Sequence, residues 1–306
     1  MRFPNIAARA FDRPLLLEPR RGQMFLATLA RLIARSDLRM DVDPTSFGGR
    51  PMPMAYDDDY APPMPTSSLP VGITQWERGK QFAAWEGVAV LEVDGTLVNK
   101  NGSVGPYCGM TGYDGLRTQV LAAIKDSGIR GIALYVESPG GEVAGCFDLA
   151  NFVREASAIK PVWAICDGMS ASAAYALSSA CRRITSSASG LVGSIGVIVA
   201  HADFSRMLEK EGIDVTLIHA GAHKADGNPF HPLPAAVRKD IQAEIDSVWD
   251  QFAAVVAAGR RMTPASVKKL EARCFLADEA RRAGLVDAVM APDEALAEFA
   301  EFLKTF

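Results

Sequence analysis

The stretch AICDGMSASAAYALSSACRRI, residues 164–184, differs from an ordinary core helix in its run of small side chains. The apolar run at residues 162–165 is typical of a buried strand, and it breaks at Asp167-Gly168. A segment made almost wholly of Ser and Ala follows, which predicts a short helix leaving the end of that strand. Side chains this small at the start of a helix indicate a place that another backbone approaches closely.

The flanking sequence repeats this strand-to-helix order. We predict strands over 86–98, 129–141, 160–168 and 212–221, and helices over 118–128, 142–158 and 235–260. Strands that alternate with helices imply parallel β-α-β units with right-handed crossovers. The expected class is therefore α/β.

Composition is that of an ordinary water-soluble protein. Of 306 residues 49% are hydrophobic, the net charge is -4, and the 32 basic residues are scattered, which argues against a nucleic-acid partner. No apolar run reaches the roughly 18 residues needed to cross a bilayer, so we expect no membrane span and a cytoplasmic location. The five cysteines show no CxxC spacing, which predicts reduced thiols and no metal site.

Three regions are expected along the chain. Residues 1–40 form an N-terminal arm with an amphipathic helix over 21–35, which we expect to dock onto the body. Residues 41–74 are rich in Pro, Met and Asp, which predicts an extended, flexible linker. Residues 75–306 carry the α/β body.

Two turns fall where parallel strands end, the edge at which open α/β sheets bind ligands. Ser138-Pro139-Gly140-Gly141 frees its backbone N–H groups to point into a cleft, as an oxyanion hole requires. Asp167-Gly168-Met169-Ser170 leads into the Ser/Ala segment. A serine on such a strand-to-helix turn can act as a nucleophile, and the serines that compete for this role are 170, 172, 178 and 179.

A serine nucleophile needs a base. The four histidines are His201, His219, His223 and His231, and the spacing leaves a triad open. Lys224, just past the apolar run at 212–221, is the other candidate, because a lysine shielded from water can become a neutral base.

Several ordered motifs resemble the signal peptide peptidase A family of serine peptidases. They are SPGG at 138–141, GMSASAAYALSSACRRI at 168–184, GLVGSIGV at 190–197, the loop around Lys224 and RCFLADEARRAGLVDAV at 273–289. Without a membrane anchor, and with an arm and linker in its place, the chain is similar to the phage head-maturation or capsid-assembly proteases. The resemblance covers residues 86–290 and implies a Clp/crotonase-like fold, with 75–306 as the peptidase domain.

The resemblance also implies a mechanism. Ser172 is the nucleophile and Lys224 the base of a Ser-Lys dyad, with Gly140, Gly141 and Ala173 as the oxyanion hole. Ser194 would orient Lys224. No cofactor or metal is implied. The expected substrates are polypeptides, including capsid, portal or scaffold proteins, and the expected assembly is a homo-oligomeric ring whose neighbouring subunits complete the groove.

One departure and three alternatives accompany this resemblance. Ala173-Ala174 replaces the glycines that usually follow the nucleophile, which adds two methyl groups beside the serine. A Clp-type protease would pair the serine with His201 and an aspartate, and an acyl-CoA enzyme of the crotonase type would use carboxylates such as Glu137 and Glu142. An inactive assembly component would keep the fold alone.

Overall fold

A computed structural model describes residues 14–18, 81–102, 105 and 109–306. The helix expected over 21–35 and the linker expected over 41–74 lie outside these ranges.

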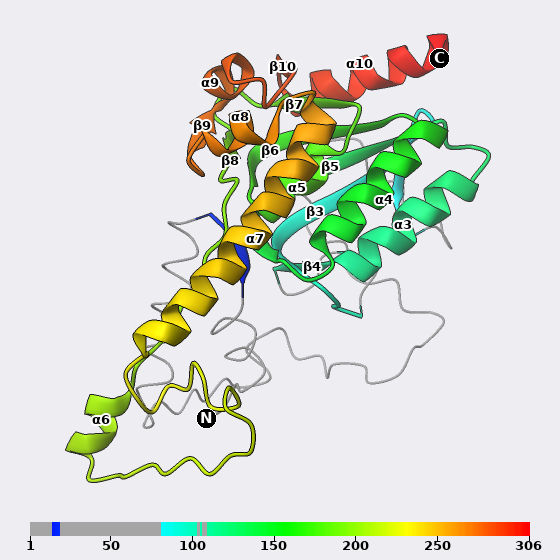
Figure 1. Ribbon diagram of the computed structural model, residues 1–306. Coiled ribbons are helices and arrows are strands. Elements are labelled where there is room, and N and C mark those ends of the chain that lie inside the picture. Colours follow the sequence, from blue (N-terminus) through cyan, green and yellow to red (C-terminus); the bar gives the residue numbers. More distant parts are fainter. Residues whose placement is uncertain (1–13, 19–80, 103–104, 106–108) are drawn as a thin grey trace, which may run out of the picture.

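A twisted sheet forms the centre of the molecule (Figure 1). Its main path runs in the order β10-β7-β6-β5-β3-β2. The inner strands are parallel, β2 is antiparallel to β3, and four short strands extend the sheet at β3, β5, β6 and β8. The bounds are β1 Leu15–Leu17, β2 Ala83–Trp85, β3 Val88–Val98, β4 Met110–Gly112, β5 Gly131–Glu142, β6 Val162–Ala171, β7 Arg183–Ser186, β8 Leu191–Gly193, β9 Cys274–Leu276 and β10 Ala288–Val289.

Helices join the parallel strands as the sequence predicted. The bounds are α3 Tyr113–Lys125, α4 Cys146–Ile159, α5 Ala173–Ser179, α6 Ser205–Lys210, α7 Ala235–Arg260, α8 Pro264–Lys268, α9 Ala277–Arg282 and α10 Pro292–Thr305. Helix α3 lies between β3 and β5 in the chain, α4 between β5 and β6, and α5 between β6 and β7. The predicted α/β fold of repeated β-α-β units is confirmed.

Each inner strand sends alternate side chains to two apolar layers. Along β5, Ile132 and Leu134 join the large core beneath α3, α4, α5 and α7. Ala133 and Tyr135, one step out of phase, join the smaller core beneath α10. On that second face Phe299 of α10 stacks on Trp163 with ring centroids 4.6 Å apart. The sheet is therefore covered on both faces, and its carboxyl edge remains for a site.

Helix α7 has the bounds that the sequence predicted, and it is only partly embedded. Its C-terminal half buries Phe252 and Val256 in the core, whereas its N-terminal half extends from the body beside α6 (Figure 1). We call residues 200–250 the projecting arm. The strand predicted over 212–221 is wrong, because no other strand of the described chain lies there to pair with it, and Ile218 is 95% exposed. No described helix is long and apolar enough to cross a membrane.

Candidate active site

Ser172 lies on the sharp turn between β6 and α5. Its backbone has φ 56 and ψ -119, a conformation that residues with a Cβ rarely adopt. Two backbone hydrogen bonds hold it there: its N–H donates to the Gly193 carbonyl at 2.8 Å, and its carbonyl accepts from Ala176 N–H at 3.0 Å. The turn therefore fixes the direction of the serine side chain.

The hydrogen bonds of the four candidate serines separate one from the rest. The Ser170 and Ser178 hydroxyls are 2.9 Å apart and bond each other, and the Ser179 hydroxyl donates to the Ala176 carbonyl at 2.8 Å. The Ser172 hydroxyl is buried and has no hydrogen-bond partner in the part of the chain that the structure describes. Burying a hydroxyl without a hydrogen-bond partner costs free energy, so among the four serines we expect Ser172 to have the catalytic role.

The glycine turn at the end of β5 lies directly against Ser172. Gly140 has φ +100, and a Cβ built on it would lie 2.8 Å from Ser172 Cβ and 2.9 Å from Ala173 N. A Cβ on Gly141 would lie 1.8 Å from the Leu97 carbonyl oxygen. Both positions thus require glycine.

The predicted oxyanion donors differ in their availability. Gly140 N–H donates to the Ser138 hydroxyl at 3.2 Å, and that hydroxyl donates to the Gly95 carbonyl at 2.6 Å. Ala173 N–H begins α5 and has no partner within the helix. Of these two groups, Ala173 N–H is therefore the better placed to donate a hydrogen bond to a ligand oxygen.

Lys224 lies elsewhere. It is exposed, within a turn of the projecting arm, where its backbone N–H donates to the Gly221 carbonyl at 3.2 Å. Because the Ser172 hydroxyl has no partner in the described chain, the Lys224 amine does not bond it there. Ser194 is buried with φ 54, and its N–H donates to the Arg273 carbonyl at 2.9 Å. A single chain thus brings together Ser172, Gly140, Gly141 and Ala173, next to the turn that holds Ser194, and leaves Lys224 apart.

The residues that the alternative mechanisms would use do not hydrogen-bond the Ser172 hydroxyl in the described chain either. His201 is half-buried but does not bond that hydroxyl. His223 bonds Asp226 at 2.8 Å within the projecting arm. The Glu142 carboxylate accepts the Asn99 N–H at 2.8 Å, which ties it to the end of β3.

The thiols near the site are protonated core groups. Burial raises the pKa of Cys146 and of Cys166 to about 12. The Cys146 thiol lies 3.7 Å from the Ala173 carbonyl, beneath α5. At neutral pH neither group supplies the thiolate that a cysteine nucleophile requires.

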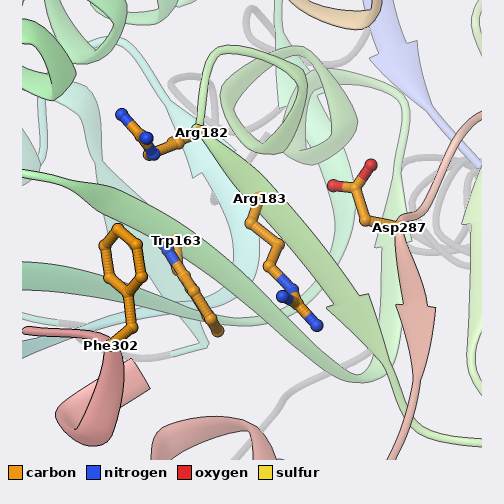
Figure 2. Close-up of a pocket in the computed structure, with 5 residues that line it drawn as sticks. All are labelled: Trp163, Arg182, Arg183, Asp287 and Phe302. Carbon is orange, nitrogen blue, oxygen red and sulfur yellow. The ribbon is translucent and has the colours of Figure 1, made fainter. Parts of the chain in front are cut away.

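A separate cavity of about 360 Å³ is lined by Trp163, Arg182, Arg183, Asp287 and Phe302 (Figure 2). The Arg183 guanidinium lies 4.7 Å from the centre of the Trp163 ring. Trp163 stands near the start of β6, whereas Ser172 follows its end. This cavity therefore lies away from the carboxyl edge that carries the serine.

One strand at the site escaped the sequence prediction. β1 pairs antiparallel with the glycine turn, in the register Leu16 to Gly141 and Leu17 to Gly140. Its sequence signal is a short leucine run bounded by Pro14 and Pro19, in the N-terminal arm and ahead of the helix expected over 21–35.

The parallel sheet, the glycine turn and the serine on a strand-to-helix turn define an α/β protein of the Clp-like class. In agreement, the Clp protease family model matches residues 110–189. The model of Peptidase family S49 matches residues 154–305. A protein of Synechocystis sp. named "Putative protease slr0021" is 30% identical over 185 residues, which are 59% of this chain and 67% of that protein. The chain belongs to peptidase family S49.

Two phage proteins are similar over nearly the whole chain. Head-tail preconnector protein GP5 of Enterobacteria phage P21 is 37% identical over 301 residues, which are 98% of this chain and 58% of that protein. Capsid assembly protease C of Escherichia phage lambda is 35% identical over 298 residues, 96% of this chain and 64% of that protein. The resemblance predicted from the motifs is confirmed, and the chain spans about three fifths of the length of these two relatives.

Proposed function

We propose that this protein is a serine endopeptidase that processes capsid, portal or scaffold proteins during phage head assembly, in the host cytoplasm or inside the assembling head. The observation that carries the proposal is the position of Ser172: its buried hydroxyl has no hydrogen-bond partner among the described residues, and its Cβ and the Ala173 N–H both lie against the Gly140 turn. The two phage relatives, one of them named a capsid assembly protease, support the substrate class.

The proposed reaction is acyl transfer to water. Neutral Lys224 takes the proton of Ser172, and the Ser172 oxygen attacks the peptide carbonyl carbon. Backbone N–H groups of Ala173 and of the Gly140-Gly141 turn stabilise the oxyanion. Lys224 then gives the proton to the leaving amine as the peptide C–N bond breaks. In the second half, neutral Lys224 takes a proton from water, the hydroxide attacks the acyl carbon, and the Ser172 oxygen leaves and takes that proton back from Lys224.

We further propose that a second copy of the chain completes the dyad. Lys224 lies on the projecting arm, which exposes apolar side chains: Met207 is 40%, Ile213 51% and Ile218 95% exposed. Packing of these residues against a neighbouring subunit would bury apolar surface and shield the Lys224 amine from water, which a neutral lysine requires. In a ring, each arm would deliver its lysine to the next subunit's Ser172, where Ser194 would orient it.

Mixed assembly tests this arrangement. Ser172→Ala and Lys224→Ala subunits are each expected to be inactive alone and to regain activity when assembled together, since a mixed pair restores one intact dyad. Lys210→Ala, an exposed lysine of the same arm, is the control and should remain active alone. An assembled mixture without activity would contradict a dyad shared between subunits.

Active-site labelling tests the nucleophile itself. A fluorescent fluorophosphonate should label the wild-type assembly at Ser172, and Ser172→Ala should not be labelled. Equal labelling of both proteins would contradict the proposed function. The same experiment distinguishes a peptidase from an inactive component that retains only the fold.

A further inference from the structure

Residues 14–18 are bound to the body as an added strand, held on both sides by backbone hydrogen bonds (β1, blue in Figure 1). On one side Leu15 to Leu17 pair with Glu142 to Gly140, and Glu18 N–H donates to the Pro139 carbonyl at 2.7 Å. On the other side Leu15 N–H donates to the Ile198 carbonyl at 2.8 Å, and Ile198 N–H donates to the Leu15 carbonyl at 2.9 Å. Extended peptides bind to sheet edges through bonds of this kind.

The strand also presents one peptide carbonyl to the candidate nucleophile. The point that a Cβ on Gly140 would occupy is 2.1 Å from the Leu16 carbonyl oxygen, 2.8 Å from Ser172 Cβ and 2.9 Å from Ala173 N. These three atoms therefore surround one small space. The Leu16 carbonyl lies beside both the serine and the helix-start N–H that we propose as an oxyanion donor.

The Leu16 side chain is fully buried in the large apolar core. A groove that encloses a leucine next to the presented carbonyl favours apolar side chains at that position of a ligand. The neighbouring glycines have no Cβ, which lets a ligand backbone lie against the turn.

We infer that residues 14–18 occupy the peptide-binding groove as an internal pseudosubstrate, in substrate register, with Leu16–Leu17 at the place of the bond to be cut. The inference rests on the proposed function. An extended protein segment with an apolar residue before the cut enters the groove only after β1 has left it. The chain thus carries its own competitor for its substrates.

Proline variants weaken the strand without removing it. Leu15→Pro lacks the N–H that donates to Ile198, and Glu18→Pro lacks the N–H that donates to Pro139. Leu15→Ala and Glu18→Ala keep these donors and serve as matched controls. Loss of two backbone hydrogen bonds corresponds to roughly a tenfold shift in strand occupancy.

The experiment measures how fast each full-length assembly is labelled by a peptidyl phosphonate that ends in leucine. The double proline variant should be labelled about tenfold faster than wild type and than the double alanine control. A synthetic peptide of residues 13–19 should slow peptidyl labelling of the proline variant, and the same peptide with aspartate in place of Leu16 should not.

The outcomes separate the two proposals. Equal peptidyl labelling of wild type and proline variant, with Ser172 still labelled, would overturn the pseudosubstrate and leave the peptidase intact. No Ser172-dependent labelling in any variant would overturn the peptidase itself. A Ser172-dependent cut between Leu16 and Leu17, detected by intact mass, would support the register, because only a segment lying in this groove presents that bond.

Discussion

Gly140 and Ser172 lie on turns at the ends of neighbouring strands, so close together that a Cβ atom added to Gly140 would clash with the Cβ of Ser172. The Cβ of an alanine at 140 would stand 2.8 Å from Ser172 Cβ, in the space that also faces Ala173 N and the Leu16 carbonyl. β5 and β6 are adjacent and parallel, so their ends meet at one edge of the sheet. The register shift near Ser138 then brings the glycine turn against the serine.

Gly140→Ala should therefore damage the site more than the fold. We expect a loss of activity of about 100-fold or more, because the added methyl fills the space next to the oxyanion donor, and a loss of about 1–3 kcal/mol of stability from the strained φ. Gly284→Ala is the control, since Gly284 has φ +77 with nothing within 4 Å of its added Cβ. If both variants kept full peptidase activity, the glycine turn would have no part in the reaction.

Serine replacements should divide into two kinds. Ser172→Ala leaves no hydrogen-bond partner unsatisfied among the described residues, so its free energy of unfolding should stay within about 0.5 kcal/mol of wild type while labelling is abolished. Ser178→Ala removes the buried hydrogen bond between the Ser170 and Ser178 hydroxyls and should cost roughly 0.5–1.5 kcal/mol. Urea unfolding measures both. A marked stability loss in Ser172→Ala would indicate that the hydroxyl has a structural role.

The sequence predicted the elements whose patterns are local. The apolar runs of β5 and β6 and the apolar stripe of α7 predicted these elements correctly. The positions of the two turns at the ends of parallel strands predicted that Ser172 lies near the glycine turn. β1 was missed because three leucines between prolines form a strand only when the distant glycine turn and Ile198 offer partners. The apolar run at 212–221 was wrongly predicted as a strand, because its local pattern is typical of a strand but the described chain offers no neighbouring strand to pair with it.

The effect of the two alanines after Ser172 on the site could not be predicted from the sequence alone. Ala173 and Ala174 are both fully buried in the large core. Their methyl groups thus contribute to packing beneath the site. Lys224 presents a similar difficulty, because we propose that its partner in the dyad belongs to a second copy of the chain.

A charge on the exposed face of the projecting arm should prevent assembly. Ile218→Glu places a carboxylate where the side chain is already 95% exposed, so the isolated subunit should keep its stability while the oligomer, and with it the activity, is lost. Sedimentation velocity measures the change in size. Ile159→Glu, at a 64% exposed isoleucine of α4, is the control and should assemble normally. An unchanged oligomer in Ile218→Glu would contradict an interface on the arm.

Lys224→Arg should test whether the Lys224 amine acts as the base. Arginine has a side chain of similar length, but it remains protonated and does not accept the serine proton. We expect assembly to persist and the hydrolysis rate to fall roughly 10²–10⁴-fold. Lys210→Arg, elsewhere on the same arm, should have wild-type kinetics. A Lys224→Arg enzyme with wild-type rate would show that another group removes the proton.

The body end of α7 is fixed by an ion pair whose effect depends on pH. Arg260 donates to both carboxylate oxygens of Asp287, at 3.0 and 2.7 Å, and Ile184 N–H donates to the same carboxylate at 2.7 Å. Burial alone would raise the pKa of Asp287, but these hydrogen bonds outweigh it and hold the pKa below its usual value near 3.8. The unfolded chain therefore takes up the proton first as the pH falls.

It follows that the contribution of Asp287 to stability is complete above about pH 4 and is lost as the pH drops through the lowered pKa. Asp287→Asn should cost about 1–2 kcal/mol at pH 7, a modest figure because the carboxylate is 37% exposed. The difference between wild type and variant should shrink when urea unfolding is repeated at successively lower pH below 3.8. A difference that stayed constant over that range would mean that the pair does not hold the base of the arm through charge.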